Sequence, residues 1–253
     1  PKTADGRVLF AVPWLGKVIL GTTDTPRNDL AREPLPFPEE VDFILSEAGK
    51  YLVRQPTRND VRSVWVGLRP LVKPQDDDGE NTKKISREHT VMSSRSGLVT
   101  VTGGKWTTYR AMAEDVLSEC FATGQLPERA GGVTVNLPLV GAPANGELLK
   151  GMNAPQGLHS YGTEAAAVAA LPGAGNWLID GLSEAMVRFA VRHEYARTVE
   201  DVLARRSRLL FLDAQRAVSI APRVAAVIEE ELGRDAGLSA FQSLALQYLP
   251  RAQ

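Results

Sequence analysis

Residues 98–110 bring together residue types that can bind a negative group. The β-branched residues at its start favour an extended strand, and Gly103-Gly104 allows a tight turn or a close approach of the backbone to a ligand. A helix is predicted from about Lys105 to Cys120, and apolar residues at steps of three and four, among them Trp106, Leu117 and Cys120, give it one apolar face. The first N–H groups of a helix have no intrahelical partner and lie at the positive end of its dipole. The stretch therefore predicts an anion-binding strand–turn–helix, and a buried turn without a ligand is the alternative.

Further donors are predicted near this turn. Those at the helix start are the side chains of Lys105, Thr107 and Thr108. Arg69 lies near the end of an extended stretch, and Arg87 lies on a predicted strand over residues 85–92, on the same face as His89 by the period of two. An arginine can bind a phosphate or a carboxylate through two hydrogen bonds. The convergence indicates an anion site, and ordinary ion pairs with surface acids are the alternative.

The elements before these residues are predicted from local patterns. Residues 7–12 and 17–21 predict two strands joined as a hairpin. Thr23 follows in a run of small polar residues, which forms either a turn or the wall of a site. Pro38 suits the first position of a helix, and apolar residues at steps of three and four continue that helix. Residues 60–68 predict another extended segment.

The composition changes after Phe121, which sets the predicted domain organisation. Residues 126–155 are rich in Gly, Pro, Asn and Ala and predict a linker. Strand patterns disappear beyond it, and helical patterns follow. Polar residues placed to cap those helices are Ser183, Thr198 and Asp213, and Gly233 is placed to end one of them. We therefore predict an α+β domain over residues 1–125 and a small all-helical domain over residues 156–253.

The overall composition excludes several classes of protein. Of the 253 residues, 43% are hydrophobic, which is enough for a sizeable core. The 29 basic and 30 acidic residues nearly balance, which argues against a nucleic-acid binder. The single cysteine, Cys120, is expected in the core, and the three scattered histidines give no metal-binding spacing. No apolar run is long enough to span a bilayer, and no signal peptide is visible.

Several segments, taken together, resemble FAD-dependent glycerol-3-phosphate dehydrogenase, the respiratory flavoprotein. They are residues 10–14, 20–24, 67–71, 85–87, 102–110 and 191–206. Each is weak alone, but in this order they are specific and span nearly the whole chain. No Gly-x-Gly-x-x-Gly motif occurs, although the family carries that dinucleotide-binding motif in its N-terminal part. The chain therefore resembles a C-terminal portion that lacks the dinucleotide-binding segment.

The resemblance implies roles for individual residues. Those implied at the substrate are Arg69, Arg87, Lys105 and Thr23. Those implied at the flavin are Gly103, Gly104, Lys105, Trp106, Thr107 and Thr108. The family oxidises sn-glycerol 3-phosphate to dihydroxyacetone phosphate by hydride transfer to FAD and passes the electrons to quinone. A base must take the proton of the C2 hydroxyl, and Lys105 and His89 are the candidates in this chain, beside a group from the absent segment.

The resemblance also implies a setting for the protein. It implies a cytoplasmic enzyme held peripherally on the inner membrane, with no nucleic-acid partner and no metal. The chain alone is expected to bind FAD weakly or not at all and to be inactive. Exposed strand edges invite self-pairing, so a homodimer is an expectation. Two alternatives stay open: a non-catalytic module that binds an anion or a partner, and a related FAD-dependent amino-acid oxidase.

A charged signature marks the helical domain. Its members are His193, Glu194, Arg197, Asp201, Arg205 and Arg206. Their helical spacing predicts an internal ion-pair network, and a docking surface for a partner chain or for membrane head groups is the alternative.

Overall fold

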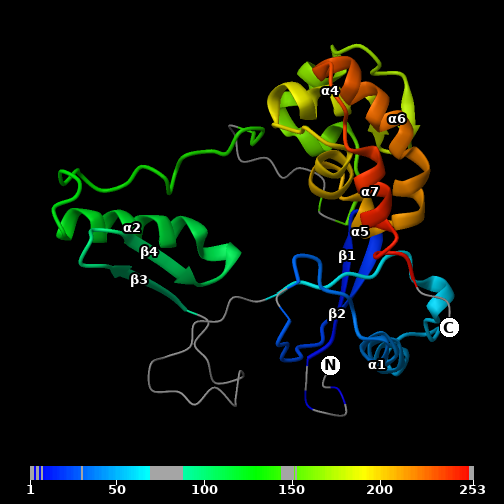
Figure 1. Ribbon diagram of the computed structural model, residues 1–253, viewed down its shortest axis with the longest axis horizontal. Helices are drawn as coiled ribbons and strands as arrows, with labels where there is room; N and C mark the ends of the chain where they lie inside the picture. Colours follow the sequence, from blue (N-terminus) through cyan, green and yellow to red (C-terminus); the bar gives the residue numbers. More distant parts are fainter. Residues whose placement is uncertain are drawn as a thin grey trace. The chain divides into compact units, whose positions relative to one another are not determined.

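A computed structural model describes residues 3, 6, 8–29, 31–68, 88–143, 151 and 153–250 (Figure 1). The contacts divide the chain into two compact units. The larger unit combines Pro1–Thr25, Ala31–Val66 and Leu139–Gln253, and the smaller combines Pro26–Leu30 and Gly67–Pro138. The boundaries predicted near residues 125 and 156 stay a prediction.

The larger unit begins with the predicted hairpin. Strands β1 (Phe10–Trp14) and β2 (Lys17–Gly21) pair in antiparallel register, with Phe10 opposite Gly21. The turn is tighter than the sequence predicts, because only Leu15 and Gly16 lie outside the strands, both with positive φ (49° and 80°). Helix α1 (Pro38–Gly49) begins at its proline, as predicted.

The predicted extended segment over residues 60–68 does not join a sheet. Residues 61–68 have no strand assignment, and their backbone bonds to the helical region instead. The Val64 N–H donates to the Tyr248 carbonyl oxygen at 2.9 Å. The Ala214 N–H donates to the Ser63 hydroxyl oxygen at 2.8 Å. Because these groups find partners on α6 and in the turn after α7, no neighbouring strand is needed to satisfy them.

The C-terminal part of the larger unit is mainly helical (Figure 1). Its elements are the 3-10 helix η4 (Leu158–Glu164), α3 (Ala165–Ala169), β5 (Trp177–Ile179), β6 (Leu182–Ser183), α4 (Glu184–His193), the π-helix η5 (Asp201–Arg206), α5 (Leu209–Leu212), α6 (Ala214–Leu232) and α7 (Leu238–Ala245). The short β5–β6 hairpin and the π-helix are additions that the sequence did not predict.

Local capping signals act as predicted. The Ser183 hydroxyl accepts from the Met186 N–H at 3.4 Å at the start of α4. The Asp213 carboxylate accepts from the Arg216 N–H at 3.1 Å at the start of α6. These caps satisfy N–H groups that have no intrahelical partner.

One hydrophobic core lies within the helical region. Its fully buried side chains include Val168, Val187, Leu203, Leu210 and Ile228, each 0% exposed. These residues come from five different elements or segments, so the core holds the short helices together. Such burial, rather than helix propensity, is the main source of stability for short helices.

The smaller unit is a hairpin with a helix. Strands β3 (His89–Ser93) and β4 (Val99–Gly103) pair in antiparallel register. The short 3-10 helix η3 (Trp106–Thr108) leads into α2 (Tyr109–Ala122), which packs against both strands. Figure 1 shows α2 lying along this hairpin.

The apolar face predicted for α2 is not buried. None of its residues is buried, Cys120 is only half-buried and Leu117 is 47% exposed. The expectation that Cys120 lies in a core is therefore wrong. A two-stranded hairpin covers only one side of a helix, so much of an apolar stripe on α2 stays in contact with solvent.

The predicted fold class is confirmed: an α+β piece is followed by a small helical domain, which also contains the β5–β6 hairpin. Within the described part of the chain, no helix combines the length and the apolar character needed to cross a lipid bilayer.

Candidate functional site

The turn between β4 and α2 depends on two left-handed glycines. Gly103 has a φ of 76° and Gly104 a φ of 78°, a region that residues with a side chain rarely adopt. A Cβ placed on Gly104 would lie 2.7 Å from Met112 Sδ and 3.0 Å from His89 Cβ. Both the backbone conformation and the close packing therefore require glycine at position 104.

The residues after the turn begin the helix with open donors. The Thr108 N–H and the Thr108 hydroxyl both donate to the Lys105 carbonyl oxygen at 3.0 Å, which closes η3. The side chains of Lys105 and Thr107 are exposed. The N–H groups of the first helical turn have no intrahelical acceptor, so they add to these side-chain donors. The structure thus leaves the side chains of Lys105 and Thr107 accessible, whereas the Thr108 hydroxyl is bonded within the turn.

Trp106 gives this site an exposed aromatic surface. Its side chain is 86% exposed, and its ring stacks on Tyr109 with centroids 5.5 Å apart and an interplanar angle of 26°. The sequence placed Trp106 on the apolar face of the helix, where burial is expected. That expectation is wrong, because Trp106 lies in η3 rather than on the part of α2 that packs against the hairpin.

His89 is a titratable residue on β3, the strand that pairs with the strand leading into the turn. It lies opposite Gly103 in the β3–β4 pairing. Its Nε2 lies 2.7 Å from a carboxylate oxygen of Asp115 on α2. A carboxylate partner of this kind orients an imidazole ring. No sequence pattern pointed to Asp115, since the pair depends on how α2 packs against the hairpin.

The predicted site residues divide into three groups. The structure brings His89 and the Gly103–Thr108 segment together in the smaller unit. Thr23, half-buried in the segment after β2, belongs to the larger unit. Arg69 and Arg87 lie outside the described residues. The roles predicted for all of these residues stay predictions.

In the described parts of the chain, no group of three or more His, Cys, Asp or Glu side chains is arranged to hold a metal ion.

In the charged signature of the helical domain, Asp201 and Arg205 mainly stabilise the start of the π-helix η5. The Asp201 carboxylate accepts from the Arg197 N–H at 2.9 Å and from the Thr198 N–H at 3.0 Å. Arg205 bonds to Glu200 at 2.6 Å and to Asp201 at 3.2 Å. Part of the predicted ion-pair network is therefore present, but Asp201 serves first as a helix cap.

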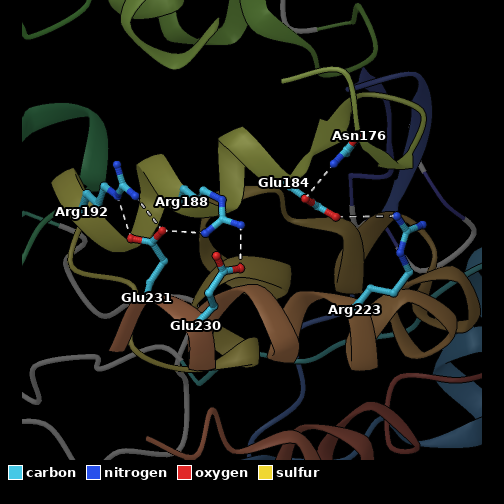
Figure 2. Close-up of polar contacts among 7 residues, drawn as sticks. All are labelled: Asn176, Glu184, Arg188, Arg192, Arg223, Glu230 and Glu231. Carbon is cyan, nitrogen blue, oxygen red and sulfur yellow. Dashed lines mark hydrogen bonds and ion pairs between the residues drawn. The ribbon is translucent and has the colours of Figure 1, made fainter. Parts of the chain in front are cut away.

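A more buried ion-pair cluster was not predicted, and it joins α4 to α6 (Figure 2). Arg188, whose side chain is 8% exposed, bonds to Glu230 and to Glu231 at 2.7 Å each. Arg192 bonds to Glu231 at 2.6 Å. Hydrogen bonds from Arg192 and then Arg188 hold the pKa of Glu231 at about 2, although burial opposes this. The arginines are four residues apart on one helix, but only packing reveals their acidic partners.

Comparison with known proteins places these features in a family. Residues 1–110 match the family model described as FAD dependent oxidoreductase. Residues 132–237 match the model described as the C-terminal domain of alpha-glycerophosphate oxidase. The probable mitochondrial glycerol-3-phosphate dehydrogenase of Dictyostelium discoideum is 38% identical over 247 residues, which cover 88% of this chain and 38% of that protein. The chain belongs to the FAD-dependent glycerol-3-phosphate dehydrogenase family.

Two further members of this family also align with most or all of the chain. The mitochondrial glycerol-3-phosphate dehydrogenase of Homo sapiens is 39% identical over 260 residues, covering 93% of this chain and 35% of that protein. This chain of the glycerol-3-phosphate dehydrogenase family thus spans well under half the length of these two relatives. The structure of glycerol-3-phosphate dehydrogenase from Bacillus halodurans complexed with FAD has the same fold, with a TM-score of 0.73 and 24% identity, over 100% of this chain and 54% of that one.

Proposed function

We propose that this chain supplies the substrate-side and helical-cap portion of a flavoenzyme that oxidises sn-glycerol 3-phosphate to dihydroxyacetone phosphate. The observation that carries the proposal is the exposed turn from Gly103 to Thr108, with its open donors. This turn lies in the part of the chain that matches the FAD dependent oxidoreductase model. Relatives that align with most of the chain bear the name glycerol-3-phosphate dehydrogenase.

The turn fits a flavin. Gly104 allows the turn to pack closely, because a Cβ there would meet Met112 and His89, and the N–H groups at the helix start would be available to an electron-rich edge of the ring. The exposed Lys105 and Thr107 add donors for the same charge. When bound, FAD supplies a two-electron acceptor for the hydride. The role of this chain is to hold and orient the ring through these donors.

Lys105 is proposed to hold the substrate as well as the flavin. An ammonium group attracts the phosphate of glycerol 3-phosphate and stabilises negative charge on its C2 oxygen. Arg69, Arg87 and Thr23 are proposed to complete the phosphate site, as the family resemblance implies. Two arginines suit a phosphate better than the zwitterionic head of an amino acid. This preference separates the proposal from an amino-acid oxidase.

His89 is the better supported candidate for the base among the residues of this chain. Its ring is oriented by Asp115 at 2.7 Å, which is the arrangement of a base held by a third group. Lys105 remains the alternative, as does a group outside this chain.

The proposal extends to the setting that the family resemblance implies. This is a quinone acceptor, a cytoplasmic enzyme peripheral to the inner membrane, and a homodimer. Support for self-association comes from the β1–β2 and β3–β4 hairpins, whose outer edges are unpaired among the described residues.

The proposal is tested by visible absorbance. The chain alone, mixed with FAD, is expected to stay inactive toward glycerol 3-phosphate. The same chain preceded by the FAD-binding segment of a relative is expected to turn yellow and to be bleached by glycerol 3-phosphate without oxygen. Bleaching by amino acids, but not by glycerol 3-phosphate, would refute the substrate. Bleaching of the chain alone would refute its dependence on a further segment.

A glycine pair provides the matched control in the extended protein. Gly104→Ala is expected to slow bleaching at least about tenfold. The new Cβ would clash with Met112 and His89, so the backbone of the turn would have to move. Gly97→Ala is the control, because Gly97 also has a positive φ (85°) but nothing lies within 4 Å of a Cβ there. Equal effects of the two substitutions would mean that the turn has no special role.

A further inference from the structure

A cavity of about 350 Å³ lies in the helical domain, and none of the candidate-site residues line it. Its walls come from η4 and the segment before it, the β5–β6 turn, α4 and the π-helix η5 with the residues after it. The apolar part is formed by Leu182, Met186, Ala190 and Val202. The polar part contains arginines, hydroxyl groups and one carboxyl group. This volume is at the lower end of the range for small-molecule sites.

The arginines at this cavity differ in their partners. Arg205 is neutralised by Glu200 and Asp201. Arg206 instead donates to the Glu194 carbonyl oxygen, and Arg208 donates to the Arg206 carbonyl oxygen at 3.2 Å. Among the residues that the structure describes, no carboxylate oxygen lies within the 4.0 Å ion-pair distance of either guanidinium group. Two positive charges are thus held at the cavity by backbone oxygens, without a carboxylate in direct contact among the described residues.

Glu194 offsets only part of this positive charge. It is the one acidic residue among those that line the cavity. Burial raises the pKa of its carboxyl group, and the nearby charges of Arg206 and Arg208 act against this rise. Burial, and then the charge of Glu194, raise the pKa of Tyr161, so its hydroxyl stays a donor. The cavity therefore has a positive excess and a neutral hydroxyl donor.

Several residues at or next to the cavity have uncommon backbone conformations. Arg208 has a φ of 56° and Tyr195 a φ of 58°, a left-handed conformation that is uncommon for large side chains. Arg206 ends a π-helix, a form that is rare and often found at functional sites. A Cβ on Gly181 would lie 2.5 Å from the Gln156 carbonyl oxygen, so the opposite wall also needs a glycine. Conformations of this kind persist where the surrounding structure enforces them.

We propose that this cavity binds a small phosphate monoester. Its phosphate would be held by Arg206, Arg208 and the Tyr161 hydroxyl, and its short carbon chain would contact the apolar wall. Two guanidinium groups without acidic partners match the nearly double negative charge of a phosphate monoester at neutral pH. A carboxylate carries a single charge and is expected to bind more weakly. The proposal does not rest on the proposed function.

The test is calorimetric titration of the whole chain at one fixed ionic strength, because salt screens such contacts. The probes are n-butyl phosphate, inorganic phosphate and pentanoate. We expect n-butyl phosphate to bind about tenfold more tightly than pentanoate, as one further charge-assisted contact would give, and more tightly than inorganic phosphate, which lacks the carbon chain. Absence of binding at about 10 mM n-butyl phosphate, or equal affinity for pentanoate, would overturn the proposal.

Arg208→Gly is the decisive variant, with Arg205→Met as its matched control. Arg208→Gly removes the guanidinium group and also relieves the left-handed strain, so the fold is expected to be retained. It should weaken n-butyl phosphate binding at least about tenfold. Arg205→Met removes an arginine of the same cavity that already has acidic partners, and should change the affinity less than about twofold. Equal losses of affinity for the two variants would indicate only a general electrostatic attraction and would overturn the proposed site.

Tyr161→Phe tests the hydroxyl separately. The ring of Tyr161 packs edge-on against Phe189, with centroids 5.4 Å apart, and phenylalanine keeps this contact. The affinity for n-butyl phosphate should fall about threefold to tenfold while the thermal midpoint stays nearly unchanged. An unchanged affinity would remove the hydroxyl from the site and contradict the proposed mode of binding.

Discussion

Glu231→Gln should destabilise the protein in a way that depends strongly on pH. Glu231 is 9% exposed and binds both Arg188 and Arg192 from α4 (Figure 2). These bonds hold its folded-state pKa at about 2, against an ordinary value of 4.5. At about 1.4 kcal/mol per pKa unit, this lowering corresponds to about 3 kcal/mol of stability at neutral pH. The exposure of Arg192 reduces the expected loss in the variant to about 2–3 kcal/mol.

The sign of the pH dependence follows from the lowered pKa. A group whose pKa is lower in the folded state stabilises the fold above its unfolded pKa. For Glu231 the stabilisation is complete above about pH 4.5 and is lost as the pH falls toward 2. The difference between wild type and Glu231→Gln should therefore shrink to about 1 kcal/mol at pH 3.

The assay is urea unfolding followed by circular dichroism, at pH 7 and at pH 3. Asp235→Asn is the control, since Asp235 is an exposed acid without an ion pair among the described residues. It should change the free energy of unfolding by less than about 0.5 kcal/mol at either pH. An equal loss for Glu231→Gln at both pH values would refute the reasoning, because the effect would then come from altered packing and not from charge.

Three further substitutions test local features of the larger unit. Gly181→Ala should lower the free energy of unfolding by more than about 2 kcal/mol, because its Cβ would lie 2.5 Å from the Gln156 carbonyl oxygen. Gly233→Ala is the control, because nothing lies within 4 Å of a Cβ there, and it should cost about 1 kcal/mol. Equal losses for the two variants would contradict this reasoning. Ser183→Ala should cost about 1 kcal/mol by removing the cap of α4, and an unchanged urea midpoint would refute that role. Ser63→Ala should lower the free energy of unfolding by about 1–3 kcal/mol, because the Ser63 hydroxyl donates to the Leu210 carbonyl oxygen and accepts from the Ala214 N–H, at 2.8 Å each. A loss below about 0.5 kcal/mol would show that water replaces both bonds.

Sequence patterns were reliable where the deciding contacts are local. Pro38 starts α1, Ser183 and Asp213 cap α4 and α6, and Gly233 ends α6 with a φ of 64°. Each of these features depends on residues within about four positions of one another, which a linear reading can see. The strand, glycine turn and helix around Gly103-Gly104 were predicted for the same reason.

Predictions failed where distant segments compete for the same groups. The stretch over residues 60–68 has the alternation of a strand, but Ser63 and Val64 bond to the helical region. The stripe on α2 has the period of a buried face, but the hairpin beside it is too small to cover it. Period and propensity describe what a segment prefers, and the available neighbours decide what it does.

The sequence by itself determined the order of elements, the helix caps, the glycine turn with its donors and the family resemblance. These features rest on neighbouring residues or on residue identity. Only the tertiary structure decided the partner of His89, the Arg188–Glu231 cluster and the cavity of about 350 Å³ beside Arg206 and Arg208. Each of these joins residues from separate elements, and their distances and burial depend on how those elements pack. Packing is a property of the whole fold, so no local pattern encodes it.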